Sequence, residues 1–286
     1  MRTNFGCLLI IILSLLTSRS WGAPLPSAQR VASLSVGADE IVWELLRGER
    51  QRIVGLSHLA RDGRYSSVAD EIPHKLAILS HNLEPLVRLK PDLVIAASYN
   101  RAETITHLKS LGIDILILEN FRTIPDILEN IALVGKKLGK VESAEKLIAA
   151  QRNALKKISL RAKSRKRIPT LLNFSPDQSV WGRDTLFNDM VELAGAHNLV
   201  AAEGITGWPI LSLEKIAKFR PDCIVTEGEE ADRAQVLAQL KSQPGWETMP
   251  AVKNGKLILL RPRLLHAVSH HLIQAVDDLS RALDAC

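Results

Sequence analysis

The sequence contains few residues of the types that mark a specialised fold or a catalytic site. Three cysteines among 286 residues are too few for a fold that is held mainly by disulfides. The GxSxG, P-loop and CxxC patterns are absent, so no common nucleophile elbow, phosphate loop or dithiol motif is present. Aromatic residues make up only 4% of the chain, so aromatic side chains outside the core are informative. The net charge of +6 is spread evenly and does not favour a nucleic-acid partner.

Long apolar runs are also absent, with one exception at the N-terminus. Arg2 precedes an apolar run over residues 7–16, and Ser20 and Gly22 place small residues before Ala23. This three-part pattern predicts a cleavable secretory signal peptide over residues 1–22 and a periplasmic location. A retained membrane anchor is the alternative, although a span of the bilayer needs about 20 apolar residues.

Removal of that signal leaves 286 − 22 = 264 residues with two cysteines, Cys223 and Cys286. Export permits a disulfide between them, because exported proteins fold under oxidising conditions. Cys223 lies in a strand-like run and Cys286 is the last residue, so the sequence does not fix their geometry. A disulfide and two free thiols are both compatible with the sequence.

Two similar stretches occur far apart in the chain. Residues 82–96 read NLEPLVRLKPDLVIA and residues 212–226 read SLEKIAKFRPDCIVT. Glu84 and Glu214 occupy equivalent places, 214 − 84 = 130 residues apart. Each stretch predicts a short amphipathic helix that ends before a proline and leads into a buried strand. A repeat of this length indicates two similar domains.

Strands and helices are expected to alternate in both halves, which is typical of α/β folds with mostly parallel sheets. Strands are expected near residues 31–35, 53–57, 93–97, 114–118, 168–174 and 256–260, and helices near 38–46, 102–111, 125–138, 185–193 and 232–240.

One amphipathic helix is expected to connect the halves over residues 140–167, with its basic end at 161–167 solvated. The predicted fold is therefore α/β, with two Rossmann-like lobes at residues 23–139 and 168–286 joined by a long rigid α-helix.

These features together resemble a known family. The two stretches described above, the opening strand and helix at 30–46, the RIVGLS strand at 52–57, the AGAHN turn at 194–198 and the GWP segment at 207–209 occur in the same order in that family. The chain resembles the metal-chelate substrate-binding proteins of ABC importers, which handle cobalamin, ferric siderophores and haem. The resemblance implies a monomeric periplasmic receptor without enzymatic activity or a cofactor of its own.

In such proteins an acidic residue at the tip of each lobe docks onto arginines of the membrane permease. Glu84 and Glu214 match these positions, and one carboxylate on each lobe suits a two-fold symmetric inner-membrane permease dimer. Favourable charges at two helix N-termini are the alternative explanation.

The ligand is expected between the lobes, at the carboxyl ends of the strands. Aromatic rings there would supply apolar surface, and arginines would bind carboxylates or phosphates. Trp43 instead falls on a helix and is expected in the core. The expected ligand-binding residues are Tyr65, His81, Tyr99, Arg101, Trp181, Arg183, Trp208, Arg261, Arg263 and His266.

The resemblance also bears on the kind of chelate. Trp208 aligns with a cleft tryptophan of cobalamin-binding members, but Leu59 and Ala97 or Ser98 stand where those members carry aromatic residues. The arginines favour an anionic ferric chelate instead. For haem, Tyr65, Tyr99 and His81 are candidate axial ligands.

Three other functions remain open. A bare-metal receptor could use His266, His270 and His271, since the first two lie four residues apart. An exported α/β enzyme could use Ser269 as a nucleophile. A receptor-like domain could also serve in sensing.

Overall fold

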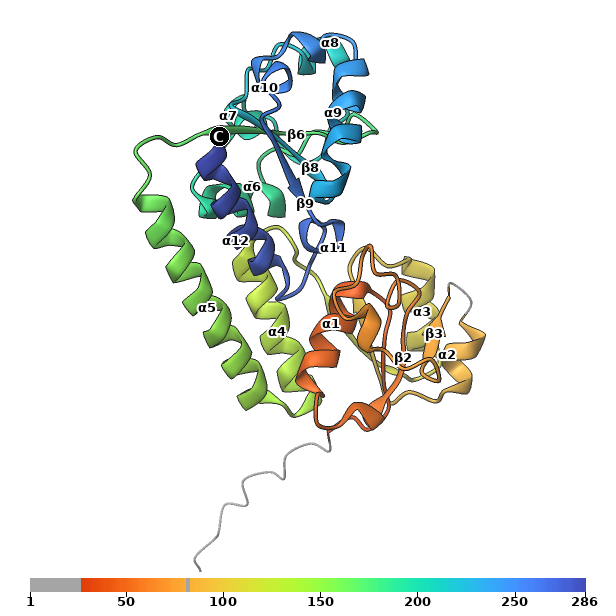
Figure 1. Cartoon of the computed structure of the whole chain (residues 1–286). Helices are drawn as coiled ribbons and strands as arrows, with labels where there is room; N and C mark the ends of the chain where they lie inside the picture. Colours follow the sequence, from red (N-terminus) through yellow and green to blue (C-terminus); the bar gives the residue numbers. More distant parts are fainter. Residues whose placement is uncertain (1–26, 81–82) are drawn as a thin grey trace, which may run out of the picture.

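Two parallel β-sheets form the framework of the computed structural model, which describes residues 27–80 and 83–286 (Figure 1). The predicted signal peptide and His81 lie outside the described residues. The first sheet has the order β3-β2-β1-β4-β5 and the second the order β7-β6-β8-β9, with every neighbouring pair parallel. The predicted α/β fold with two mostly parallel sheets is confirmed.

The strands of the first lobe are β1 (Val31–Ser33), β2 (Ile53–Ser57), β3 (Ala77–Leu79), β4 (Leu93–Ala97) and β5 (Asp114–Leu118). Those of the second lobe are β6 (Thr170–Asn173), β7 (His197–Asn198), β8 (Cys223–Glu227) and β9 (Leu257–Leu260).

Helices cover both sheets and connect the lobes. The first lobe contains α1 (Val36–Leu45), α2 (Glu84–Arg88), α3 (Ala102–Ser110) and α4 (Ile124–Leu138), and α5 (Val141–Lys163) follows as the connecting helix. The second lobe contains α6 (Leu186–Ala194), α7 (Leu199–Ala202), α8 (Leu213–Ile216), α9 (Arg233–Ser242), α10 (Pro250–Lys253), α11 (Pro262–Leu265) and α12 (Leu272–Ala282). No helix within residues 27–80 and 83–286 has the length and apolar character needed to cross a bilayer.

The α4–α5 hairpin is fixed by its own sequence. Thr123 and Asp126 form a reciprocal capping box at the start of α4. Gly139 ends α4 in the left-handed conformation, with φ at 70°, which glycine adopts without strain. A Cβ on Gly135 would lie 2.4 Å from the Cβ of Ala144, so glycine permits the close approach of α4 and α5. The two helices therefore run side by side (Figure 1).

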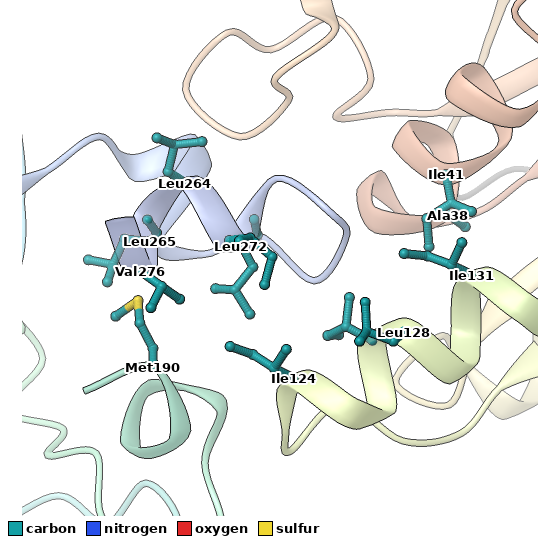
Figure 2. Close-up of a cluster of buried hydrophobic side chains, with 14 of the residues drawn as sticks. Ala38, Ile41, Ile124, Leu128, Ile131, Met190, Leu264, Leu265, Leu272 and Val276 are labelled. Carbon is teal, nitrogen blue, oxygen red and sulfur yellow. The ribbon is translucent and has the colours of Figure 1, made fainter. Parts of the chain in front are cut away.

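One hydrophobic core extends through both lobes. Leu128 and Ile131 of α4 are buried in the same cluster as Ile41 of the first lobe and Met190 and Leu272 of the second (Figure 2). Trp43 belongs to this core with 2% of its surface exposed, as expected from its place on a helix. The lobes are thus joined by shared packing in addition to the connecting helix.

The basic end of α5 differs from its prediction. The helix ends at Lys163 rather than at residue 167. Arg161 pairs with Asp277 of α12 at 2.8 Å, and the side chain of Arg165, 9% exposed, donates to the carbonyl of Ala194 at 2.7 Å. The prediction of a solvated helix end is wrong for these two arginines, because they anchor α5 to α6 and α12.

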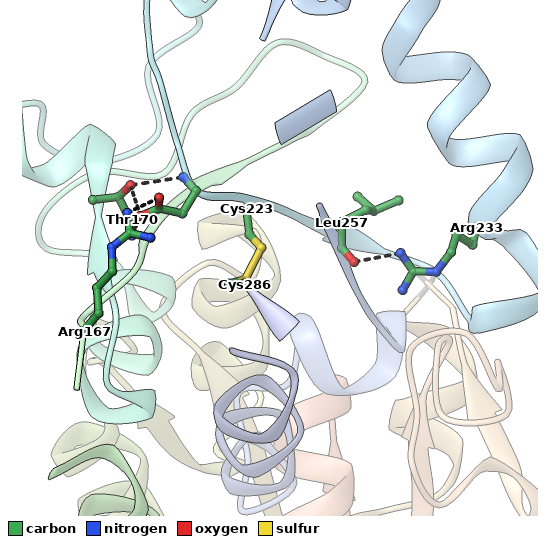
Figure 3. The surroundings of a disulfide bond; sticks show 7 residues. Arg167, Thr170, Cys223, Arg233, Leu257 and Cys286 are labelled. Carbon is green, nitrogen blue, oxygen red and sulfur yellow. Dashed lines mark hydrogen bonds and ion pairs between the residues drawn. A yellow bond between two sulfur atoms is a disulfide. The ribbon is translucent and has the colours of Figure 1, made fainter. Parts of the chain in front are cut away.

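The two cysteines of the described chain form a disulfide between β8 and the C-terminus (Figure 3). Cys223 and Cys286 have Cα atoms 5.9 Å apart, within the usual range for this bond. Nearby, Arg233 of α9 donates to the carbonyl of Leu257 in β9 at 2.9 Å. The disulfide holds the C-terminal segment against β8, one of the two inner strands of the second sheet.

A buried polar contact joins α1 to the segment that precedes α12. Glu40 is 1% exposed, accepts from the Ser67 amide at 2.7 Å and also accepts from the hydroxyl of Ser269 in the second lobe. Beside it, a Cβ on Gly37 would lie 2.5 Å from Val268, so the two lobes touch closely here. Ser269 is fully buried and its hydroxyl donates to Glu40, which does not suit the nucleophile of an exported enzyme.

Replacing Glu40 with glutamine is expected to stabilise the protein by up to about 3 kcal/mol near pH 8 and very little near pH 4. Burial raises the pKa of Glu40 to about 7 from 4.5. The folded protein therefore binds more protons than the unfolded chain between these values, so wild-type stability falls as the pH rises through that window. Urea unfolding across this range measures the effect. Glu44→Gln on the same helix is the control, and an unchanged pH slope in E40Q would contradict the prediction.

Candidate ligand-binding cleft

A cavity of about 490 Å³ lies between the lobes. Gly63 and Arg64, from the loop after β2, line it from the first lobe. Thr226 and Glu227 at the end of β8, and Arg261 and Arg263 after β9, line it from the second lobe. The cavity thus lies at the carboxyl ends of strands, where open parallel sheets place their ligands, and has the volume of a small-molecule site.

A second cavity of about 320 Å³ lies in the first lobe, at the carboxyl ends of β1, β2, β3 and β4. Its lining combines apolar and polar side chains and includes Leu34, Ser57, Leu59, Tyr99 and Arg101. Tyr99 is 58% exposed, and the centroid of its ring lies 5.2 Å from that of Phe121. This cavity offers an aromatic face and a cation close to one another.

A buried carboxyl supports the wall of the second cavity. Asp39 accepts from the Ser57 amide at 3.0 Å and from the hydroxyls of Ser33 and Ser57. Burial raises the pKa of Asp39 to about 7 in spite of these hydrogen bonds. The contacts hold the end of β2 in place next to the cavity.

Glu227 is the centre of the charged groups in the cleft. Its Oε1 lies 2.5 Å from Nη2 of Arg64, across the gap between the lobes, and its Oε2 lies 3.0 Å from Nε2 of His266. The carboxylate raises the pKa of Arg64 further above its ordinary value. Behind this group, the Trp181 ring lies 5.9 Å from His266 and 5.0 Å from Phe187, edge to face in both cases.

The structure brings some of the predicted ligand residues to these cavities. Arg261 and Arg263 line the cavity between the lobes, and Tyr99 and Arg101 line the second cavity. Arg261 also pairs with Asp278 at 3.2 Å, which partly neutralises its charge. These four positions stay candidates for ligand contact.

Other predicted residues lie elsewhere or act indirectly. Neither of the two cavities is lined by Tyr65, Trp181, Arg183, Trp208 or His266, although Trp208 is 57% exposed. Arg183 donates to the carbonyl of Ala201 at 2.8 Å and its backbone pairs with the 205–207 segment, so it holds the loops that carry Trp181 and Trp208. His81 lies outside the described residues.

The three histidines proposed for a bare metal do not form one cluster. His266 is bonded to Glu227 in the cleft, whereas His270 and His271 line a separate cavity beside α5 and α12. Burial lowers the pKa of His270 to about 3 and also lowers that of His271. Within the described part of the chain, no three metal-ligating side chains come together.

The two candidate docking glutamates lie on short helices of different lobes, away from α5 (Figure 1). Glu84 begins α2, is 62% exposed and pairs with Arg88 one turn later. Glu214 on α8 is fully exposed, and hydrogen bonds from its own backbone amide and from Ser212 lower its pKa. Both carboxylates therefore lie at the surface, where a partner can reach them.

Sequence reasoning missed Arg64 and Glu227. Arg64 stands in the loop that follows β2, beside the predicted Tyr65, and Glu227 is the last residue of β8. Their positions at or after the carboxyl end of a strand could have marked them as candidates. The sequence could not predict that they pair, because they are 163 positions apart.

The chain matches the sequence model of a known protein family. The model of a family described as periplasmic binding protein matches residues 31–264. The chain belongs to this family. The match covers all nine strands of both lobes and the connecting helix, and it ends before α12.

Individual relatives of this chain are consistent with that assignment. An uncharacterised ABC transporter substrate-binding lipoprotein of Bacillus subtilis is 27% identical over 263 residues, covering 89% of this chain and 80% of the relative. A cobalamin-binding protein of Halobacterium salinarum is 30% identical over 262 residues, covering 89% of this chain and 69% of the relative. The predicted resemblance to ABC-importer substrate-binding proteins is confirmed.

A solved structure supports the same fold. The periplasmic heme-binding protein RhuT from Roseiflexus sp. RS-1, in its apo form, superimposes with a TM-score of 0.76 at 23% identity, covering 89% of this chain and 97% of that one. The chain is thus a substrate-binding protein of the ABC-transporter class, and the names of its relatives describe binding proteins rather than enzymes.

Proposed function

We propose that this periplasmic binding protein captures one metal chelate between its lobes and delivers it to an inner-membrane ABC permease. The protein would reach the periplasm by means of the cleavable segment 1–22 and act there without chemical conversion of the ligand. The observation that carries this proposal is the cavity of about 490 Å³ that residues of both lobes line at the carboxyl ends of two parallel sheets.

The arginines of the cleft favour an anionic ferric chelate over cobalamin. Arg64, Arg261 and Arg263 line the cavity between the lobes, and Arg101 lines the second cavity. Three carboxylates, of Glu227, Glu229 and Asp232, also line the cavity between the lobes. Guanidinium groups bind carboxylates in a bidentate manner, which suits acidic chelates. Similar proteins are named for the binding of cobalamin and of heme, both metal chelates.

Shared packing between the lobes supports a receptor that moves little on binding. Leu128 and Ile131 of α4 contact a core that continues into α6 and α12, and Glu40 reaches Ser269 across the lobes. A large closing motion would break these buried contacts, at a cost of several kcal/mol.

Fluorescence titration tests the proposed function. Trp181 lies next to the cleft and is expected to report binding of ferric siderophores, haemin or cyanocobalamin to the purified protein. We expect saturable one-to-one binding of at least one chelate, with a Kd of about 1 µM or below. Failure of the whole panel to bind, or turnover of a chelate by the protein, would contradict the proposal.

A further inference from the structure

Glu227 occupies the position in the cleft that an acidic ligand group would take. Its carboxylate closes the gap between the lobes by contacting Arg64 at 2.5 Å, while its second oxygen stays on His266 at 3.0 Å. Both partners line or adjoin the cavity proposed for the ligand. Arg64, the cation from the first lobe that lines this cavity, is therefore already paired with a carboxylate of the protein.

A ligand group can displace Glu227 from Arg64 without a large loss of stability. The side chains of Arg64 and Glu227 are 54% and 27% exposed, so water and ions reach both of them. Ion pairs that water reaches in this way contribute little to stability, because side-chain ordering and solvation offset the attraction. A ligand carboxylate offers Arg64 an acceptor oxygen of the same kind, so it can replace Glu227 at small cost.

His266 remains a hydrogen-bond partner of the Glu227 carboxylate when Arg64 is no longer in contact with it. The bond between Glu227 and His266 lies within the second lobe, where the packing of His266 against Trp181 supports it. Loss of Arg64 therefore does not leave Glu227 without a partner. By contrast, a ligand without an acidic group has no means of replacing the carboxylate on Arg64.

We propose that Glu227 is an internal substitute for a carboxylate of the ligand and that Arg64 selects chelates carrying such a group. Without ligand, Glu227 holds Arg64 across the cleft. With ligand, a carboxylate of the chelate takes its place on Arg64, and Glu227 remains on His266. This inference rests on the proposed function and adds a substrate class, namely chelates with at least one free carboxylate.

Matched probes and variants test this exchange. The probes are haemin, which carries two carboxylates, and haemin dimethyl ester, in which both are blocked. Glu227→Gln is expected to tighten haemin binding about two- to fivefold, because the competitor for Arg64 is weakened. Arg64→Gln is expected to weaken haemin binding, and neither variant should change binding of the ester.

The control is Glu229→Gln. Glu229 lines the same cavity, but its side chain belongs to the capping box of the 3₁₀ turn at Glu230–Asp232. Equal haemin affinity in wild type and Glu227→Gln, with all proteins folded by circular dichroism, would overturn the exchange while leaving the proposed function intact. If wild type binds neither these probes nor any chelate of the wider panel, the proposed function fails, and the inference fails with it.

Discussion

Replacing Glu84 and Glu214 together with lysine is expected to reduce uptake of the chelate by on the order of tenfold or more, without change in ligand affinity. The two carboxylates are exposed on α2 and α8 of different lobes and lie at equivalent places of the internal repeat. A two-fold symmetric permease would meet one of them with each subunit. Charge reversal at both places turns attraction into repulsion, which costs several kcal/mol in a desolvated interface.

A matched control separates docking from general charge effects. Glu142 and Glu145 are also exposed but lie at the start of α5, away from both tips. The double variant Glu142→Lys with Glu145→Lys introduces the same change in net charge and should transport normally. Weakened chelate binding in the Glu84 and Glu214 variant would place these residues in ligand capture instead of docking.

Replacing Cys286 with serine is expected to lower the free energy of unfolding by about 4 kcal/mol. The disulfide closes a loop with a sequence separation of 63 residues, and removal of such a cross-link increases the entropy of the unfolded chain. Cys286 is the better position to change, because Cys223 is 2% exposed and a serine hydroxyl there would be buried. Chemical denaturation under oxidising conditions measures the loss.

Reduction of the wild-type protein provides the internal control for this prediction. Reduced wild type and Cys286→Ser should unfold at the same denaturant concentration, and reductant should leave the variant unchanged. Equal stability of the oxidised wild type and the variant would show that the bond does not constrain the chain.

The sequence predicted best those elements whose pattern is local. The strand at 93–97 has the predicted bounds, because a strand buried within a parallel sheet is a short apolar run between polar turns. The edge strand at 114–118 also has its predicted bounds. The contacts of the basic segment at the end of α5 could not be predicted from a local pattern. Arg165 looks like a solvent-exposed basic residue in the sequence, yet it is 9% exposed because α6 and α12 supply its partners.

In the candidate site, too, local sequence patterns predicted some features and long-range contacts determine the others. Positions at strand ends indicated the cleft, and Arg261 and Arg263 do line the cavity between the lobes. Tyr99 and Arg101 line the second cavity, within the first lobe. The contact of Arg64 with Glu227 depends on how the two lobes face each other, which no local pattern encodes. The shared core that sets this arrangement likewise joins α4 to residues far along the chain.

Native mass spectrometry tests the central claim most directly. The purified protein, incubated with a panel of ferric siderophores, haemin and cyanocobalamin, is expected to gain the mass of one intact chelate per chain. The added mass should be unchanged after prolonged incubation, since a receptor does not convert its ligand. A protein that gains no chelate from the panel, or that releases a chemically altered one, would contradict the account.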